Sequence, residues 1–424
     1  MRAFLRLCCA GSLAALAFPG GALAGVKTLV FTSAPIEVGA FGVERGGQLV
    51  PSPKEDGYVV GMRADIFDLL GNPVPHTDVM LHHVVFAKLG TPETTCSSFT
   101  GFDGRTSNVS VERFYAEGEE HAVLSLPEPF GYPNRGSDLW GLVYMHMNHH
   151  ARDSVVQVRY TVSYATGEQR TTVKPLWLDV RNCRADPVFN VPGTGGPGST
   201  YKEVWDYRLP MSGLLVLGGG HLHGGGISLD VSDTSCGSLF TSYPTWGGIE
   251  PRPVLHEPGP RHMTEFSDPA GRPVQAGDTL RLTATYDNSR PHVRVMGISM
   301  VFLAPAPVAG CRSYESLRPE PTTPEPVTIQ LLKPPTGALR RVTSTWVGDY
   351  AYGAQRVSLR RGTRFTWRFV GTVQHDVTLA SGPVGFASPS LTRGTYSFRF
   401  TRPGTYRLFC SLHPSRMTQI VTVH

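Results

Sequence analysis

The sequence predicts an all-β protein built from several β-sandwiches. Short runs in which apolar and polar residues alternate recur along the chain, for example over residues 154–164 and 279–286, and turn residues bound them. Alternation with a period of two is typical of strands that bury one face. Long amphipathic helical patterns are nearly absent. The chain has 424 residues, 40% of them hydrophobic. That length exceeds what one core usually holds, so we expect two or three domains.

The first residues predict export. A basic start leads into an apolar stretch that ends at Ala22-Leu-Ala24, which is typical of a signal peptide over residues 1–24. We therefore expect a mature chain that begins at Gly25 and lies in the periplasm or outside the cell. No later stretch approaches the ~18 apolar residues of a membrane span, so we expect no membrane insertion after signal removal. A net charge of +5 gives no reason to expect a nucleic-acid partner.

Two segments rich in glycine and proline predict the domain boundaries. Residues 190–200 have the composition of a hinge, and prolines recur through residues 304–337. We expect one jelly-roll-like sandwich over residues 25–190, a second over residues 200–304, a Pro-rich linker over residues 305–340 and a third sandwich over residues 341–424.

In the first block, two strand-like segments carry histidines. His82 and His83 are adjacent within residues 80–86, and residues 142–150 end in a second histidine-rich run. Neighbours on a strand point to opposite faces, so His82 and His83 can share a metal only where the strand bends or ends. The two segments together predict a copper or zinc site made by His82, His83 and either His146 or His149.

The second block offers a different ligand set. His221 and His223 are separated by one residue, so both rings point to the same strand face, and the triple glycines on each side should leave them open to solvent. Met296 and Met300 lie on one face of a later strand. Two imidazoles and a thioether form a site soft enough to stabilise Cu(I).

The C-terminal block carries the most specific motif. Cys410, His413 and Met417 combine a thiolate, an imidazole and a thioether, a set that suits copper with the methionine as the weak axial donor. The alternating run over residues 372–379 supplies the missing imidazole, His375. Residues 397–409 predict a strand, a Pro-Gly turn and a strand, so that Cys410 lies where the final hairpin ends.

From about residue 347 to the C-terminus, the chain resembles cupredoxins of the plastocyanin and pseudoazurin type. The resemblance implies a type 1 copper site with His375, Cys410 and His413 as equatorial ligands and Met417 as axial ligand.

Over about residues 60–303, the order of the histidine motifs and the methionine strand resembles the copper type II monooxygenases, the group of peptidylglycine α-hydroxylating monooxygenase and dopamine β-monooxygenase. The resemblance implies two sandwiches that face each other across an open cleft, each with one copper. It implies that an electron-storing copper is held by His82, His83 and His149, with His146 as the alternative to His149. It also implies that the copper where oxygen is activated and a C–H bond is hydroxylated is held by His221, His223 and Met296, with Met300 as the alternative to Met296.

Five cysteines follow the signal peptide: Cys96, Cys183, Cys236, Cys311 and Cys410. With Cys410 assigned to copper, four remain in an oxidising compartment, where pairing is the default. Three connectivities are possible. We favour Cys96 with Cys183 and Cys236 with Cys311, because each pair would then lie within one domain.

These observations lead to one main hypothesis and two alternatives. The main hypothesis is an exported copper monooxygenase in which the type 1 domain, on its linker, delivers single electrons to the front domains. Its substrate, a small molecule or a peptide, is not identified by the sequence. An external electron donor could dock on Arg360, Arg364 and Arg368, although a solvated face is the simpler interpretation.

The first alternative is a periplasmic copper-binding or electron-transfer protein without oxygenase chemistry, since the same ligands suit copper buffering. The second, a nitrite-reductase-like enzyme, is less favoured, because only the C-terminal block resembles a cupredoxin. We expect residues 117–121 to form a solvated acidic turn, and His256, His262 and His292 to be surface residues.

Overall fold

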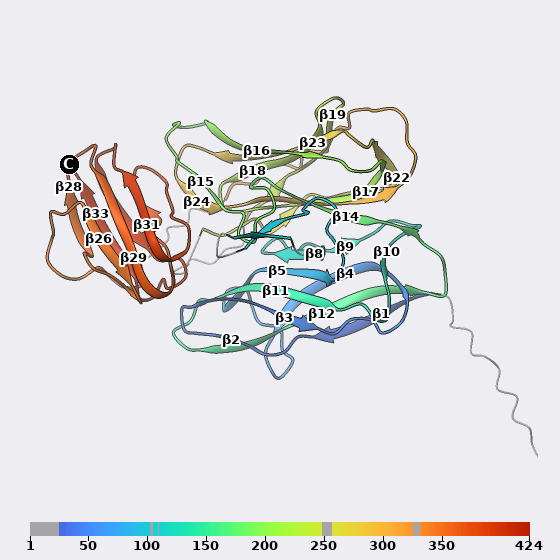
Figure 1. Cartoon of the computed structure of the whole chain (residues 1–424), viewed down its shortest axis with the longest axis horizontal. Helices are drawn as coiled ribbons and strands as arrows, with labels where there is room; N and C mark the ends of the chain where they lie inside the picture. Colours follow the sequence, from blue (N-terminus) through green and yellow to red (C-terminus); the bar gives the residue numbers. More distant parts are fainter. Residues whose placement is uncertain (1–24, 102–104, 109, 248–256, 325–330) are drawn as a thin grey trace, which may run out of the picture.

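The computed structural model describes residues 25–101, 105–108, 110–247, 257–324 and 331–424. These residues form strands and contain no helix, which confirms the predicted all-β class. Two sandwiches lie one above the other, and a third domain, orange to red, lies at one end of the pair (Figure 1). The predicted signal peptide is outside the described residues. Within the described ranges, no helix is long and apolar enough to cross a membrane.

The first sandwich packs a seven-stranded sheet on a four-stranded one. The seven-stranded sheet has the order β1–β12–β4–β10–β13, with β2 beside β12 and β9 beside β4; its strands are β1 (Gly25–Thr32), β2 (Ile36–Val38), β4 (Gly57–Phe67), β9 (Leu124–Ser125), β10 (Phe130–Asn134), β12 (Ser154–Thr166) and β13 (Thr171–Thr172). The four-stranded sheet has the order β3–β11–β5–β8, from β3 (Val43–Val50), β11 (Trp140–Asn148), β5 (Val79–Leu89) and β8 (Val111–Gly118). A small hairpin joins β6 (Phe99–Thr100) and β7 (Thr106–Ser107).

The second sandwich contains two four-stranded sheets. One has the order β14–β25–β17–β22, from β14 (Lys174–Asp179), β25 (Gly297–Pro305), β17 (Gly213–Leu222) and β22 (Phe266–Val274). The other has the order β16–β23–β18–β19, from β16 (Thr200–Arg208), β23 (Thr279–Asp287), β18 (Gly226–Asp233) and β19 (Gly237–Ser242). Two short pairs complete it: β15 (Phe189–Val191) with β24 (His292–Val295), and β20 (Pro244–Thr245) with β21 (His262–Met263).

The alternating pattern of the sequence produces these sandwiches directly. In β12, every second residue from Val156 to Tyr164 is buried in the core of the first sandwich, while the residues between them are more exposed. Each tyrosine at this depth also needs a partner for its hydroxyl. The Tyr164 hydroxyl, for example, donates to the carbonyl oxygen of Glu55 at 2.6 Å.

The boundary between the two sandwiches differs from the prediction. β14, which the expected boundary at residue 190 assigns to the first sandwich, pairs with β25 of the second. The glycine-rich segment after β15 belongs to the second sandwich as well, since the N–H of Gly193 donates to Asn288 Oδ1 at 3.0 Å. A change in local composition marks a loop, but it does not show with which distant strand a segment pairs.

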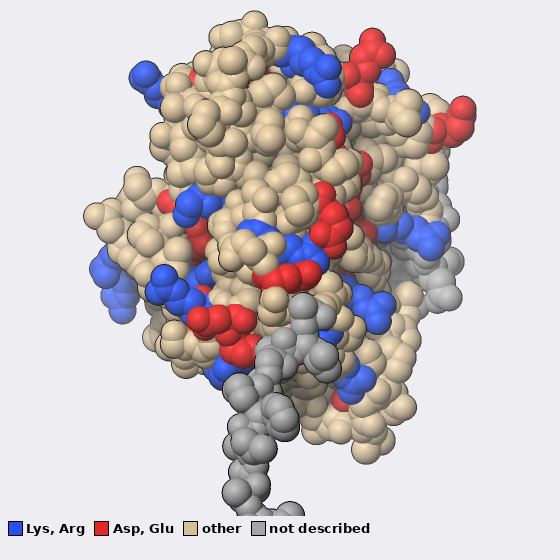
Figure 2. Space-filling model, turned by 90° about the vertical axis from the view of Figure 1, so that its right-hand side faces the viewer, with Lys and Arg blue, Asp and Glu red and all other residues tan. Residues whose placement is uncertain are grey.

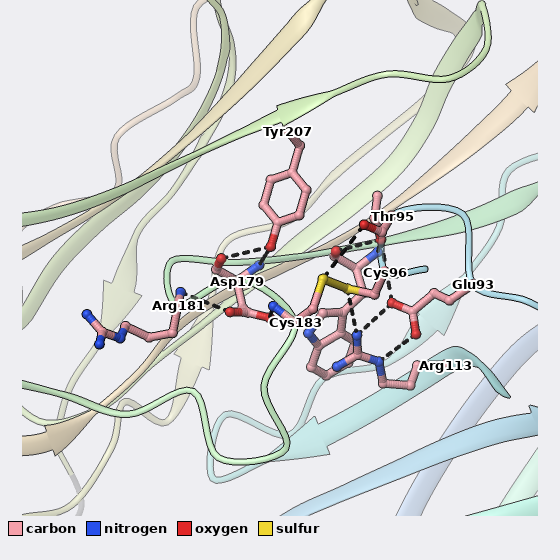
Figure 3. The surroundings of a disulfide bond; sticks show 9 residues. Glu93, Thr95, Cys96, Arg113, Asp179, Arg181, Cys183 and Tyr207 are labelled. Carbon is pink, nitrogen blue, oxygen red and sulfur yellow. Dashed lines mark hydrogen bonds and ion pairs between the residues drawn. A yellow bond between two sulfur atoms is a disulfide. The ribbon is translucent and has the colours of Figure 1, made fainter. Parts of the chain in front are cut away.

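Both predicted disulfides are present, Cys96–Cys183 and Cys236–Cys311. The expectation that each lies within one domain is wrong for the first. Cys96 follows β5 of the first sandwich, yet it is buried with Cys183 in the core of the second. Figure 3 shows this bond beside Arg113 of β8, whose guanidinium forms two hydrogen bonds with Glu93. The disulfide therefore ties a loop of the first sandwich to the second.

The two sandwiches share buried contacts where the resemblance to monooxygenases implies an open cleft. Val85 and Ala116 of the first sandwich pack in one cluster with Trp177, Met296 and Ile298 of the second. Away from this interface, at the end opposite the third domain, Lys and Arg are interspersed with Asp and Glu on the outer face (Figure 2). Mixed charge of this kind is typical of a solvent-facing surface.

The third domain also has two sheets. Their orders are β27–β26–β29–β31 and β28–β33–β32–β30, from β26 (Ser344–Gly348), β27 (Ala351–Tyr352), β28 (Arg356–Leu359), β29 (Arg364–His375), β30 (Thr378–Ser381), β31 (Leu391–Arg399), β32 (Gly404–Phe409) and β33 (Thr418–Val423). The expected hairpin over residues 397–409 is not formed, because β31 and β32 belong to different sheets. The final hairpin is β32–β33, and Cys410 begins its loop.

The Pro-rich linker lies along the second sandwich up to residue 322. The Cys236–Cys311 disulfide fixes its start, the hydroxyl of Ser316 accepts from the N–H of Thr241 at 2.7 Å, and the hydroxyl of Thr322 accepts from the N–H of Trp246 at 2.8 Å. The third domain is docked as well, since the N–H of Gly385 donates to the carbonyl oxygen of Pro192 at 2.9 Å. A loosely tethered domain is not what the structure shows.

Candidate metal centres

The C-terminal domain brings its predicted soft ligands together. His375 ends β29, Cys410 follows β32, and both are fully buried. Cys410 Sγ lies 3.6 Å from His413 Nδ1 and 4.0 Å from His375 Nδ1, and the two imidazole nitrogens are 3.1 Å apart. The N–H of Met417 donates to the carbonyl oxygen of His413 at 3.1 Å, which closes the loop and buries the methionine in the domain core.

The surroundings of these residues fit a metal ion. Burial raises the pKa of the Cys410 thiol above its usual range, so a thiolate here needs a cation beside it. Burial, and then the nearby His375, lower the pKa of His413 to about 4, which keeps its imidazole neutral. His375 Nε2 lies 3.3 Å from Asp349 Oδ1, so Nε2 carries the proton and Nδ1 is left for a metal. Thiolate, imidazole and thioether together suit a type 1 copper.

In the first sandwich, His82 and His83 lie at a β-bulge. Leu81 of β5 pairs with His146 of β11, and His83 pairs with Met145. Because His146 and Met145 are consecutive, His82 is an extra residue in the ladder. The core-facing residues of β5 accordingly change from odd to even numbers across this point. Both histidines therefore face away from their own core, toward the second sandwich. The bulge is thus the irregularity in the strand that two adjacent histidines need in order to point to one side.

In the second sandwich, His221 lies near the end of β17 and His223 directly follows the strand, and their rings lie close together as expected. The ring centroids are 5.0 Å apart at nearly a right angle, and the two Nε2 atoms are 3.1 Å apart. The expectation that flanking glycines leave the pair open to solvent is wrong, because His223 is buried. Gly225 has a φ of +85°, and a Cβ there would lie 2.2 Å from Nδ1 of His292, so this glycine makes room for a packed ring.

His82, His83, His221 and His223 form one group, which we call the histidine cluster. The ring centroid of His82 lies 5.1 Å from that of His83 and 5.1 Å from that of His223. Residues that the monooxygenase resemblance places on two separate coppers thus meet at the interface of the two sandwiches. Gly118 of β8 allows this approach, since a Cβ there would lie 3.1 Å from His221 Nδ1.

Two carboxylates from the loop after β8 orient the cluster. Glu119 Oε1 lies 3.0 Å from His82 Nδ1, and Glu120 Oε2 lies 2.9 Å from His221 Nδ1. A carboxylate can only accept, so each Nδ1 donates and each Nε2 keeps its lone pair for a metal. Burial tends to lower the pKa of His221, but Glu120 outweighs it, so that this pKa is raised. The expectation of a solvated acidic turn at residues 117–121 is wrong, since Glu117 and Glu120 are buried.

His83 adds a ring with an unused nitrogen. Its Nδ1 is buried and has no hydrogen-bond partner among the described residues. Burial, and then the nearby His221, lower its pKa to about 4, so the ring is neutral. A neutral, buried imidazole is a ligand type that copper and zinc accept.

The two histidines that we expected as alternatives for the third ligand, His146 and His149, lie at the end of β11 and directly after it. His146 pairs with the core residue Leu81, so its ring points into the first sandwich, where it stacks on Tyr144 at 5.5 Å. His149 lies beyond the end of β11, where its N–H donates to the carbonyl oxygen of Asp78 at 2.9 Å. The bulge and the facing sandwich, which local spacing does not reveal, bring the imidazoles of His221 and His223 to the two histidines of β5.

The register of β17 and β25 separates the two candidate methionines. His221 pairs with Ile298 and Gly219 with Met300. Leu222 pairs with Gly297. One further residue along the antiparallel ladder therefore places Met296 opposite His223. Met296 is buried, and this register places it nearer than Met300 to His223. Sequence reasoning overlooked Met145, which pairs with His83 across β5 and β11.

Two cavities adjoin the cluster. One of about 530 Å³ lies between the sandwiches and is lined by His83, His221 and Met296 together with many apolar side chains, among them Val85 and Ile298. The other, of about 280 Å³, lies where the three domains meet, and its lining includes His82, His223, Met296, Phe409 and Ser411. The last two residues flank Cys410, so this cavity separates the two candidate centres.

Of the remaining histidines, His292 is buried and its Nδ1 lies 2.7 Å from Glu257 Oε2, so the expectation of a surface residue is wrong for it. His262 is exposed, and His256 lies outside the described residues.

Comparison with known proteins finds relatives of the C-terminal domain. No family model matches the chain. Over 83 residues it is 29% identical to amicyanin-alpha of Methylorubrum extorquens, an alignment that covers 19% of this chain and 70% of that protein. Among solved structures, it is similar to a purple cupredoxin from Nitrosopumilus maritimus, with 27% identity, 20% of this chain and 100% of that chain covered and a TM-score of 0.18. It is also similar to the Cu(I) form of an amicyanin variant, with 25% identity, 20% and 84% coverage and a TM-score of 0.19.

These similarities cover about a fifth of the chain. The likeness of the two front sandwiches to copper monooxygenases rests on the order of their histidine motifs alone. In sequence, the C-terminal domain is similar to the cupredoxins.

Proposed function

We propose that this chain is an exported copper oxidoreductase in which a type 1 centre exchanges single electrons with a metal centre held by the histidine cluster. The cluster would oxidise a C–H bond of a small, largely apolar molecule with dioxygen. The observation that carries this proposal is the carboxylate-backed cluster beside an apolar cavity, with the cupredoxin-like domain docked against it.

The type 1 copper would be held by His375, Cys410 and His413, with Met417 as the weak fourth donor. A copper ion in this set supplies one-electron transfer. Backbone hydrogen bonds close the 410–417 loop and Asp349 orients His375, so the surrounding protein holds these ligands in place. Little rearrangement is then needed when the charge of the site changes.

The histidine cluster would hold one or two further copper ions, with Met296 as a thioether beside His223. Copper bound there supplies one-electron chemistry with dioxygen. Glu119 and Glu120 hold the protons on His82 and His221, which fixes both rings with Nε2 toward the cluster. The packed interface around Trp177, Met296 and Ile298 excludes water from one side.

The 530 Å³ cavity supports a small, apolar substrate. Its volume is in the range of small-molecule sites. Apolar side chains from both sandwiches line it, and His83 and His221 are part of its wall, so a bound molecule would lie against the cluster. Leu49 and Val143, which also line it, are partly exposed and offer an apolar entry.

An external donor would reduce the type 1 centre. His413 is half-buried and packs at 4.9 Å against the ring of Tyr350, so it is the ligand nearest to solvent. Arg360, Arg364 and Arg368 are exposed on the same domain and would favour an acidic donor.

A second candidate is a copper-binding or electron-transfer protein without oxygenase chemistry. It is favoured by the comparisons, because the matched relatives are cupredoxins. In that case the histidine cluster would store copper or zinc.

The deciding experiment is copper stoichiometry and EPR on the copper-loaded protein, followed by anaerobic reduction and exposure to dioxygen. We expect type 1 and type 2 signals together, and reoxidation by dioxygen that His223→Ala removes while the blue type 1 band persists. One type 1 copper and no other metal would contradict the oxidoreductase and support the electron-transfer protein.

A further inference from the structure

We propose that Arg294 couples the two centres: it docks the cupredoxin-like domain through Asp376 and completes a bonded route from Cys410 to His223. This inference rests on the proposed function and adds the path that electrons take. Arg294 belongs to β24 of the second sandwich, and Asp376 follows the ligand His375.

On the cupredoxin side, Asp376 is built into the type 1 site. Its N–H lies 3.5 Å from Cys410 Sγ, and its Oδ1 accepts from the N–H of Ser411 at 2.8 Å. The residue is fully buried. A buried carboxylate next to a thiolate needs a cation, and the second sandwich supplies one.

That cation is the guanidinium of Arg294. Its Nη1 lies 3.7 Å from Asp376 Oδ2, and its Nη2 donates to Asp186 Oδ2 at 2.7 Å. The planar guanidinium thus bridges two carboxylates from two domains, a role that suits arginine better than lysine. Val293 packs against the core of the cupredoxin-like domain one residue earlier, so two consecutive residues of β24 contribute to this contact.

The backbone of Arg294 is held in an unusual conformation. Its φ is 54°, in the left-handed region that non-glycine residues rarely adopt. Asn190 maintains it: Oδ1 accepts from the N–H of Arg294 at 3.1 Å, while Nδ2 donates to the carbonyl oxygen of Ala387 in the cupredoxin-like domain at 3.3 Å. Strained residues held by several contacts concentrate at functional sites.

From Arg294, the route continues through bonds to the histidine cluster. Met296 follows two residues later in the chain, and its carbonyl oxygen accepts from the Tyr286 hydroxyl at 2.5 Å. The same hydroxyl oxygen accepts from the N–H of His223 at 2.9 Å. Electronic coupling falls less steeply through covalent and hydrogen bonds than across empty space. This path has three hydrogen-bonded steps, Cys410 to Asp376, Met296 to Tyr286 and Tyr286 to His223. The fourth non-covalent step, Asp376 to Arg294, is an ion pair at 3.7 Å.

The electron balance of the step is simple. One electron leaves Cu(I) at the type 1 centre, which becomes Cu(II), and reduces Cu(II) at the histidine cluster to Cu(I). No bond is made or broken. A small-molecule reductant restores the type 1 centre. Arg294 is a positioning residue here, since it touches neither copper.

The test is flash reduction of the type 1 centre in anaerobic, copper-loaded full-length protein, with the decay of the reduced state followed in the blue band. Arg294→Met removes the bridge, Arg294→Lys keeps the charge, and Arg402→Met is the matched control. Arg402 crosses the same pair of domains, donating to the carbonyl oxygen of Thr194 at 3.3 Å, but it is exposed.

We expect Arg294→Met to slow the decay by about tenfold or more, since removing one partner of a buried ion pair shifts a docking equilibrium by at least that factor. Arg294→Lys should recover part of the rate, Arg402→Met should match the wild type, and the blue band at equilibrium should be unchanged in all three. A decay in Arg294→Met as fast as in the wild type overturns the inference.

A second measurement separates this inference from the proposed function. If the wild-type cluster binds no copper, electron delivery fails as a proposal, and small-angle X-ray scattering then tests docking alone. A larger radius of gyration in Arg294→Met than in Arg402→Met would support the docking role, and equal radii would overturn it. If Arg294→Met does not fold, Arg294→Lys carries both measurements, and wild-type values there would overturn the inference.

Discussion

The two candidate centres are built in opposite ways. In the type 1 site, three of the four ligands come from the single loop after β32, and the fourth ends a strand of the same domain. In the histidine cluster, two ligands come from a bulge in β5 of the first sandwich and two from the end of β17 in the second. Local spacing encodes the first centre, whereas the packing of two domains encodes the second.

The two centres nevertheless share one device. A carboxylate fixes one ring nitrogen of a histidine in each case: Asp349 for His375, Glu119 for His82 and Glu120 for His221. This similarity supports a metal-binding role for the cluster, because metal-binding histidines usually donate their other ring N–H to a carboxylate, a backbone carbonyl or water.

The largest expected effect is that each of two substitutions removes one centre completely and leaves the other intact. Cys410→Ser should abolish the blue band and leave copper in the cluster, because the thiolate is unique to the type 1 site. His223→Ala should remove the cluster copper and leave the blue band. Metal analysis with EPR measures both. Loss of both signals in either variant would show that the centres are not independent.

A large effect on stability should follow from removing the disulfide between the sandwiches. Replacing Cys96 and Cys183 by serine should lower the free energy of unfolding by about 2–5 kcal/mol. Because this bond joins the two sandwiches, the melting temperature of the front domains should fall more than the temperature at which the blue band is lost. Replacing Cys236 and Cys311 is the control, since that bond fixes the linker. Equal shifts of the two transitions in the first variant would contradict the assignment.

A smaller effect is expected from Glu120→Gln. The amide can still contact His221, but it no longer holds a proton on Nδ1 by charge. Metal affinity of the cluster should fall about 10–100-fold, while the type 1 centre is unaffected. Competition with a chelator measures it. Asp349→Asn is the reciprocal control at His375, and an unchanged cluster affinity in Glu120→Gln would argue against a metal at His221.

The smallest effect concerns pH and the metal-free protein. Burial, followed by the neighbouring His83, lowers the pKa of His146 to about 3, whereas an unfolded histidine titrates near 6.5. As pH falls below about 6.5, the unfolded state takes up the proton first, so stability is lost until the folded pKa is reached. Between pH 7 and pH 5, His146 accounts for up to about 2 kcal/mol of this loss.

His146→Phe keeps the ring that stacks on Tyr144 and removes the titration. Denaturant unfolding of the metal-free protein at both pH values should therefore show a smaller loss than in the wild type. The same loss in both proteins would mean that other groups cause the acid sensitivity.

What the sequence could predict follows from the range of the interactions. The all-β class follows from alternation, and the grouping of Cys410, His413 and Met417 follows from short spacing. The disulfides could be predicted because only four cysteines remain once Cys410 is assigned to copper. The boundary near β14 could not be predicted in this way, because its partner β25 lies more than a hundred residues away in the chain. The role of Glu120 was missed for the same reason, since its partner His221 belongs to the other sandwich. Glu119 pairs with His82 of its own sandwich, from which it is 37 residues away in the chain. A dense group of carboxylates directly after a strand was the available signal.

The bulge at His82 has an evolutionary consequence. Without that one residue, β5 would alternate regularly, with the same side chains in its core and a single histidine facing outward. Inserting one codon therefore turns a second histidine to the outer face, while the same side chains stay in the core on both flanks. A strand of a sandwich can thus acquire a second outward-facing imidazole, or lose it, through a change of one residue.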